Sequence, residues 1–97
     1  MIEVSPVSIE DKTTLGLRVQ LPNSPPLVMI IGQKGFVSCG FINMDAAEKF
    51  NVAAAMVSGV KSFDDVLNAE VKVATAKAQN LGVKAGIKGK EALRLLL

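Results

Sequence analysis

The spacing of the hydrophobic residues changes once along the chain, at Asn43, and this change constrains the fold more than any other feature. Before Asn43, apolar residues alternate with polar ones or form short runs between turn residues, as they do in β-strands. After Asn43, the three- and four-residue spacings typical of α-helices appear. A chain that places most of its strands first and its helices later is predicted to be an α+β protein, in which helices pack on a sheet.

Four strands are predicted before Asn43. Residues 7–9 alternate apolar and polar side chains, residues 27–31 form a continuous apolar run, and residues 36–42 form the fourth strand. Residues 22–26 contain three prolines, which a central strand excludes, so we expect a surface loop there. Residues 15–21 place polar side chains on one face and apolar ones on the other, which is typical of a strand with one buried face. The apolar face consists of Leu15, Leu17, Val19 and Leu21.

The second part of the chain contains two clear helix starts. Asn43 is a good N-cap for a short helix over residues 44–50, which is followed by an alanine-rich segment, residues 52–57, that we interpret as a buried strand. Ser62 and Asp65 resemble a capping box, so the spacing of apolar residues predicts a helix over 62–81. Residues 90–97 form a final helix.

These elements predict one domain over residues 1–97 with the element order ββββ-α-β-α-α. The sheet is expected to be mixed, with about five strands and with helices packed on it. Only the connection between residues 36–42 and 52–57 contains a helix between two strands, so this pair is expected to be parallel.

Composition excludes several classes of function. The 97 residues suit a single domain, and 49% of them are hydrophobic, enough for one core. The chain has no His and one Cys, which excludes Ser-His-Asp triads, Cys-His pairs and internal disulfides. We therefore predict no metal site, and no cofactor can be named from the sequence. One free thiol favours an intracellular location.

Charge and hydropathy patterns indicate a cytosolic protein. The net charge is only +2, and the basic residues near the end of the chain have no aromatic residues beside them, so we do not expect binding to nucleic acid. These basic residues are Lys84, Lys88, Lys90 and Arg94. No apolar run approaches the roughly 20 residues of a membrane span, so no membrane association is expected.

One candidate site follows from the expected topology. The carboxyl ends of two parallel strands share one edge of a sheet, where ligands often bind, and here residues 38–43 and 58–62 would meet. Two helix starts and a lysine there suit a small molecule or an anion, and this binding module is our first functional hypothesis. The candidate ligand-binding residues are Cys39, Gly40, Asn43, Ser58, Gly59, Lys61 and Ser62.

Two other hypotheses remain open. Cys39 is the candidate nucleophile of an enzyme without histidine, although no general base is evident and a structural buried thiol is the default interpretation. A homo-oligomer is the third hypothesis, because 21% charged residues is a small share and the apolar end, residues 95–97, is a candidate contact. Asn43 and Ser62 also have a purely structural interpretation, as helix caps.

Several segments of the chain resemble the DUF1805 family of YunC-like small proteins of unknown function. The resemblance rests on Gly35–Asn43, Val57–Leu67, Leu81–Gly86 and Gly89–Leu93, in that order, and covers nearly the whole chain. It implies a small α+β domain and supplies no activity. The recurring motif positions fall on Cys39, Gly40, Asn43, Ser58, Gly59, Val60, Lys61 and Asp65.

Overall fold

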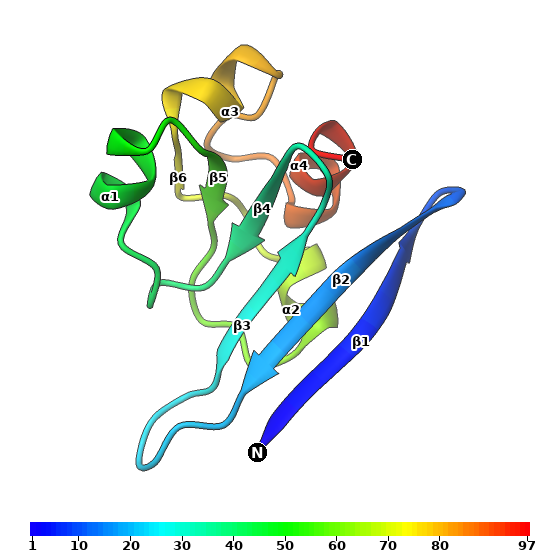
Figure 1. Cartoon of the computed structure of the whole chain (residues 1–97), viewed down its shortest axis with the longest axis vertical. Coiled ribbons are helices and arrows are strands. Elements are labelled where there is room, and N and C mark those ends of the chain that lie inside the picture. Colours follow the sequence, from blue (N-terminus) through cyan, green and yellow to red (C-terminus); the bar gives the residue numbers. More distant parts are fainter.

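The computed structural model describes all 97 residues, which form one six-stranded sheet with four helices. The strands lie in the sheet in the order in which they occur in the chain (Figure 1). All neighbouring pairs are antiparallel except β4 and β5, which are parallel, as the sequence predicts. The strands are β1 (Ile2–Ile9), β2 (Lys12–Val19), β3 (Leu27–Ile31), β4 (Gly35–Ser38), β5 (Ala53–Met56) and β6 (Val73–Ala74).

The helices are short, and two of them cover one face of the sheet. In chain order they are α1 (Met44–Lys49), α2 (Phe63–Asn68), α3 (Ala76–Asn80) and α4 (Gly89–Leu95). Helices α2 and α4 pack against each other and against the central strands, and both lie behind the sheet in Figure 1. The core between them includes Val28, Ile30, Val37, Val66 and Leu93. The α+β class with a mixed sheet is therefore confirmed.

Local sequence signals correctly mark the starts of α1 and α2. The Asn43 side chain accepts a hydrogen bond from the amide of Ala46 at the start of α1, and Ser62 does the same for Asp65 at the start of α2. Helix α1 ends in the left-handed Asn51 (φ 58°) and helix α3 ends in Gly82 (φ 100°). Both ends have the two backbone hydrogen bonds of a Schellman motif, which satisfies the last carbonyl groups.

The long helix predicted over residues 62–81 is wrong. The structure divides this segment into α2, β6 and α3, which brings the strands to six and the helices to four. The β-branched Val73 lies in β6, and Val71, just before it, lies outside any helix and donates its amide to Ile87 O at 2.8 Å. A second helix then begins at the N-cap Thr75. Backbone partners from a distant segment of the chain therefore replace the helical hydrogen bonds that the local pattern favoured.

Three smaller expectations also differ from the structure. Strand β4 stops at Ser38, because the chain turns at Cys39–Ile42 to reach α1, so the strand predicted over 36–42 is too long. The final helix covers Gly89–Leu95 instead of residues 90–97. The apolar end of the chain is not a free contact surface, because Leu96 is fully buried and its two leucine neighbours pack against the core.

The register of the strands sorts their side chains onto two faces. On the face that α2 and α4 cover, which we call the helix face, one row of cross-strand partners is Ser5, Gly16, Ile30, Val37, Ala55 and Ala74. The next row belongs to the opposite face, which we call the open face, and consists of Val4, Leu17, Met29, Ser38, Met56 and Val73. The apolar face predicted for residues 15–21 thus points away from the covering helices α2 and α4.

Candidate functional site

A pocket lies where the candidate segments follow the parallel strands β4 and β5. It has a volume of about 280 Å³ and opens between the β2–β3 loop and the two segments that leave these strands. We call it the edge pocket. Its lining residues are Pro25, Pro26, Cys39, Gly40, Phe41, Ser58, Gly59, Val60 and Lys61.

Sheet pairing brings these three segments together. The parallel register aligns Ser38 with Met56, so the residues that follow β4 and β5 leave the sheet side by side. On the other side, Cys39 is joined to Val28 of β3 by a backbone hydrogen bond of 2.9 Å. This contact places the prolines that precede β3 beside the residues that follow β4. The pocket is therefore a product of strand order and register, and its walls are tied to the sheet.

The thiol of Cys39 is part of the wall and is nearly buried. The residue is 5% exposed, and its Sγ accepts a hydrogen bond of 3.4 Å from the backbone amide of Val28. The chain has no His, and Lys61 is the only charged residue that lines the pocket. Since the edge pocket offers the thiol no carboxylate or imidazole as a general base, the geometry favours a structural Cys39.

Lys61 is held in place through its backbone. Its carbonyl oxygen accepts a hydrogen bond of 2.8 Å from Arg18 Nε on β2, and its amide donates to Asp65 Oδ2 at 3.0 Å. Asp65 therefore completes a modified capping box, in which its carboxylate reaches the residue before the N-cap. These two contacts fix the backbone, while the exposed side chain of Lys61 supplies the only cation of the pocket lining.

The structure separates the candidate residues into two groups. Cys39, Gly40, Ser58, Gly59 and Lys61 lie together in the edge pocket. The other two, Asn43 and Ser62, are N-caps outside its lining, and each uses its side-chain oxygen on its own helix. Helices α1 and α2 have six residues each, and the caps occupy amides of their first turns. The expectation that helix starts supply the anion-binding groups is therefore not supported.

Sequence reasoning missed part of the pocket wall. Pro25 and Pro26 lie outside the predicted edge of residues 38–43 and 58–62, whereas Phe41 and Val60 lie within it but were not named as ligand-binding candidates; these four residues make the pocket largely apolar. The β3–β4 hairpin could have revealed the two prolines, since residues that flank a hairpin pair must lie together. Phe41 is 51% exposed beside the pocket, and no sequence signal marked it as a binding residue.

The basic end of the chain is partly neutralised by acidic side chains. Arg94 Nη2 donates to Glu91 Oε2 at 2.7 Å, and Arg94 Nε lies 3.7 Å from Glu10 Oε1. The hydrogen bond and the charge of Glu91 raise the pKa of Arg94, and the charge of Glu10 adds to this shift.

No group of three His, Cys, Asp or Glu side chains is arranged to hold a metal ion. None of the four helices has the length and apolar character that crossing a membrane requires.

The fold and the edge pocket define a small α+β protein, and its family is clear from comparison with known proteins. Residues 38–96 match the family described as a domain of unknown function, DUF1805, and the chain belongs to this family. It is similar to the uncharacterized protein YunC of Bacillus subtilis strain 168, with 27% identity over 97 residues that cover 96% of this chain and 95% of YunC. The resemblance noted in the sequence is thus confirmed.

A solved structure has the same fold. It is the crystal structure of a protein of unknown function, TA1206, from Thermoplasma acidophilum. The TM-score is 0.94 and the identity 33%, and the match covers 100% of this chain and 94% of that chain. This similarity confirms the mixed α+β architecture and assigns no activity.

Proposed function

We propose that this protein is a small-molecule binding protein whose edge pocket holds a small organic acid. The observation that carries the proposal is an apolar pocket with one cation at its wall: Phe41 and Val60 provide the apolar surface, and Lys61 provides the charge. Ligand pockets are typically apolar with a few polar groups that orient the ligand. A volume of about 280 Å³ is at the small end of such pockets, which suits a compact ligand.

The proposal also explains two glycines at the pocket. A Cβ at Gly40 would meet only Met56 Sδ, at 4.0 Å, and a Cβ at Gly59 would meet nothing within 4 Å. Both positions therefore border open space, where added side chains would narrow the pocket. Gly59 also has a φ of 72°, which L-residues rarely adopt, so this turn favours glycine for conformational reasons as well.

Benzoate is a suitable first probe for this proposal. Its ring matches the apolar wall and its carboxylate can approach Lys61, so we expect amide chemical shift changes at Gly40, Gly59 and Lys61 in an NMR titration. A ligand of this size is expected to bind with a Kd of roughly 1 mM. Lys61→Ala should weaken binding about five- to tenfold, which is the effect of one exposed charge-assisted contact. Lys49→Ala, on α1, is the matched control and should leave the affinity unchanged.

Two outcomes would count against this assignment. If benzoate shifts no amide of the edge pocket at concentrations far above the expected Kd, the pocket does not bind small acids. If benzyl alcohol binds as well as benzoate, and Lys61→Ala binds both normally, the pocket recognises apolar molecules and Lys61 has no role in it.

Catalysis by Cys39 is the alternative, and the rate of thiol alkylation tests it. We expect iodoacetamide to modify native Cys39 at least 100-fold more slowly than the unfolded chain, because the residue is 5% exposed and its Sγ accepts a hydrogen bond from the Val28 amide. Mass spectrometry after timed quenching measures both rates. Alkylation of the native protein at the rate of the unfolded chain, or faster, would restore Cys39 as a candidate nucleophile.

We also propose that the protein works in the cytosol and self-associates. A single free cysteine supports the location, since secreted domains of this size commonly use disulfides. The small share of charged residues supports the self-association.

A further inference from the structure

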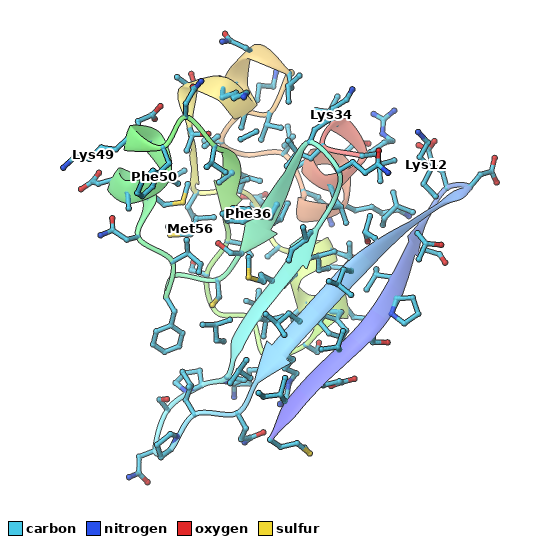
Figure 2. All side chains as sticks on the ribbon, in the orientation of Figure 1. Lys12, Lys34, Phe36, Lys49, Phe50 and Met56 are labelled. Carbon is cyan, nitrogen blue, oxygen red and sulfur yellow. The ribbon has the colours of Figure 1, made fainter.

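The open face of the sheet is apolar and carries no charged residue. Beside the row that runs from Val4 to Val73, two further rows are Pro6, Leu15, Ile31, Phe36 and Ala54, and Ile2, Val19 and Leu27, and a last row at the β1–β2 turn pairs the uncharged Ser8 with Thr13. The exposed fractions reach 66% for Ile2, 60% for Val4 and 46% for Leu15. No helix lies in front of β1, β2 and β3 in Figure 1, and Figure 2 shows Lys12 and Lys34 at the rim, near the strand ends.

Strand β2 carries the side chains expected if the open face is buried. Its open-face residues Leu15, Leu17 and Val19 are large and apolar, whereas its helix-face residues are Thr14, Gly16 and Arg18. Strand β1 repeats the inversion at its start, where Glu3 faces Arg18 on the helix face. An amphipathic strand normally directs its apolar side toward a core. In the monomer the apolar side of β2 is left without a covering layer.

The open face is also hollowed. A depression of about 370 Å³ lies between β1, β2 and the β3–β4 turn, and Val4, Pro6, Leu15 and Ile31 are among the residues that line it. Such a hollow leaves apolar atoms without packing partners on one side. Side chains of a facing surface could fill it and restore these contacts.

The edges of the sheet are less suitable for association. Strand β1 forms one edge, and Pro6 in its middle lacks the amide that a paired strand would need. Strand β6 forms the other edge and has only two residues. A partner is therefore expected to pack on the open face of the sheet, and not to add a strand at one of the sheet edges.

We propose that the open face is the interface of a homodimer, in which two sheets pack face to face about a two-fold axis. With about 4.8 Å between strands and 3.3 Å between residues, the flat area of the sheet over β1–β4 is roughly 400 Å². Side-chain relief adds to this area, whereas the open-face residues Ser38 and Ala54 are fully buried and add none, so the interface is centred on β1–β3 and is at most the roughly 800 Å² per partner of a standard interface. An uncharged face also meets its own copy without bringing like charges together.

A second copy fits this face better than the other candidate occupants. A partner with a charged binding surface would find no complementary charge on it. A lipid surface is usually met by Trp and Tyr, and the chain contains neither.

Sedimentation equilibrium at about 100 µM, where an interface of this size should be largely occupied, tests the proposal. We expect a mass twice the 10.2 kDa of the chain. The double variant Val4→Lys/Leu15→Lys should be monomeric, because it places four ammonium groups in the interface of each dimer. Phe50→Lys is the matched control: Phe50 is 79% exposed on the α1 side (Figure 2), so this variant should remain dimeric.

Three results would overturn the homodimer: a monomeric wild type at this concentration, a double variant that stays dimeric, or a monomer that binds phosphatidylcholine vesicles through this face. Should the double variant fail to fold, methyl NMR of the wild type decides the question. A soluble paramagnetic agent should then broaden the methyl signals of Ile2, Val4 and Leu15 at least threefold less at about 200 µM protein than at 5 µM. Equal broadening at both concentrations would overturn the proposal.

Discussion

Gly89→Ala should destabilise the protein by about 3 kcal/mol, although glycine to alanine in a helix usually stabilises by about 1 kcal/mol. Gly89 is the first residue of α4, and a Cβ there would overlap the carbonyl oxygen of Val66 in α2. The Gly89 amide also donates to Ala69 O at 2.7 Å, which fixes the two helices at this short separation. Helix α4 therefore has to move or lose its packing. Thermal unfolding should show a Tm lower by roughly 15 °C.

Gly40→Ala is the matched control for this substitution. Gly40 has no positive φ, and its added methyl group would make only an ordinary contact with Met56. We expect its free energy of unfolding to stay within about 0.5 kcal/mol of the wild type. If Gly89→Ala and Gly40→Ala have the same Tm, the close approach of α4 to α2 does not limit the stability of the protein.

Local signals in the sequence were sufficient at the starts of α1 and α2, which local hydrogen bonds hold in place. The caps at Asn43 and Ser62 were predicted from single residues, because each satisfies a backbone group of its own helix. The parallel pairing of β4 and β5 was also predictable, since the intervening segment contains a helix and antiparallel hairpins do not need one.

The error over residues 62–81 has a long-range cause. Apolar residues such as Val66, Val71 and Ala78 fall on a helical stripe, and the same residues are buried in the observed core. The spacing was therefore compatible with both structures. What decides between them is the pairing of Val71 with residues 86–87, and a pattern search within one segment cannot detect such a partner.

The candidate site was predictable to the extent that it depends on strand order. Cys39, Gly40, Ser58, Gly59 and Lys61 follow two parallel strands and do lie together. Helix caps and anion-binding residues use the same residue types, so the sequence could not separate Asn43 and Ser62 from the pocket. The apolar wall formed by the β2–β3 loop was not predicted, although the pairing of β3 with β4 places the residues before β3 beside those that follow β4.

The amphipathic pattern of β2 correctly identifies an apolar face, but the core of the monomer lies on the other face of the strand. Residues 15–21 predicted a buried apolar face, and the intramolecular core lies on the other side of the strand. Periodicity reports that a face is suited to burial, and it does not say whether the covering layer belongs to the same chain. The proposed homodimer would reconcile the pattern with the structure.

Thr75→Val should be the most damaging substitution that preserves side-chain shape, at about 3 kcal/mol. The buried hydroxyl donates to Val52 O at 2.7 Å and accepts from the Ala54 amide at 3.0 Å, both of them beside or within β5. It also caps α3 by accepting from the Ala78 amide at 3.4 Å. Valine has nearly the same volume, so the loss measures these hydrogen bonds: two buried backbone groups become unpartnered and a helix cap is removed.

Two further variants isolate the hydroxyl in urea unfolding. Thr75→Ser keeps it and deletes one methyl group, so it should cost only about 1 kcal/mol. Ser38→Ala removes the other fully buried hydroxyl of the sheet, which has no hydrogen-bond partner, and should leave stability unchanged or raise it by up to about 1 kcal/mol. A loss of stability at Thr75 without a loss at Ser38 would show that the hydrogen bonds of a buried hydroxyl, and not its burial, determine the change in the free energy of unfolding. Equal losses at both positions would contradict this account, because packing would then explain them.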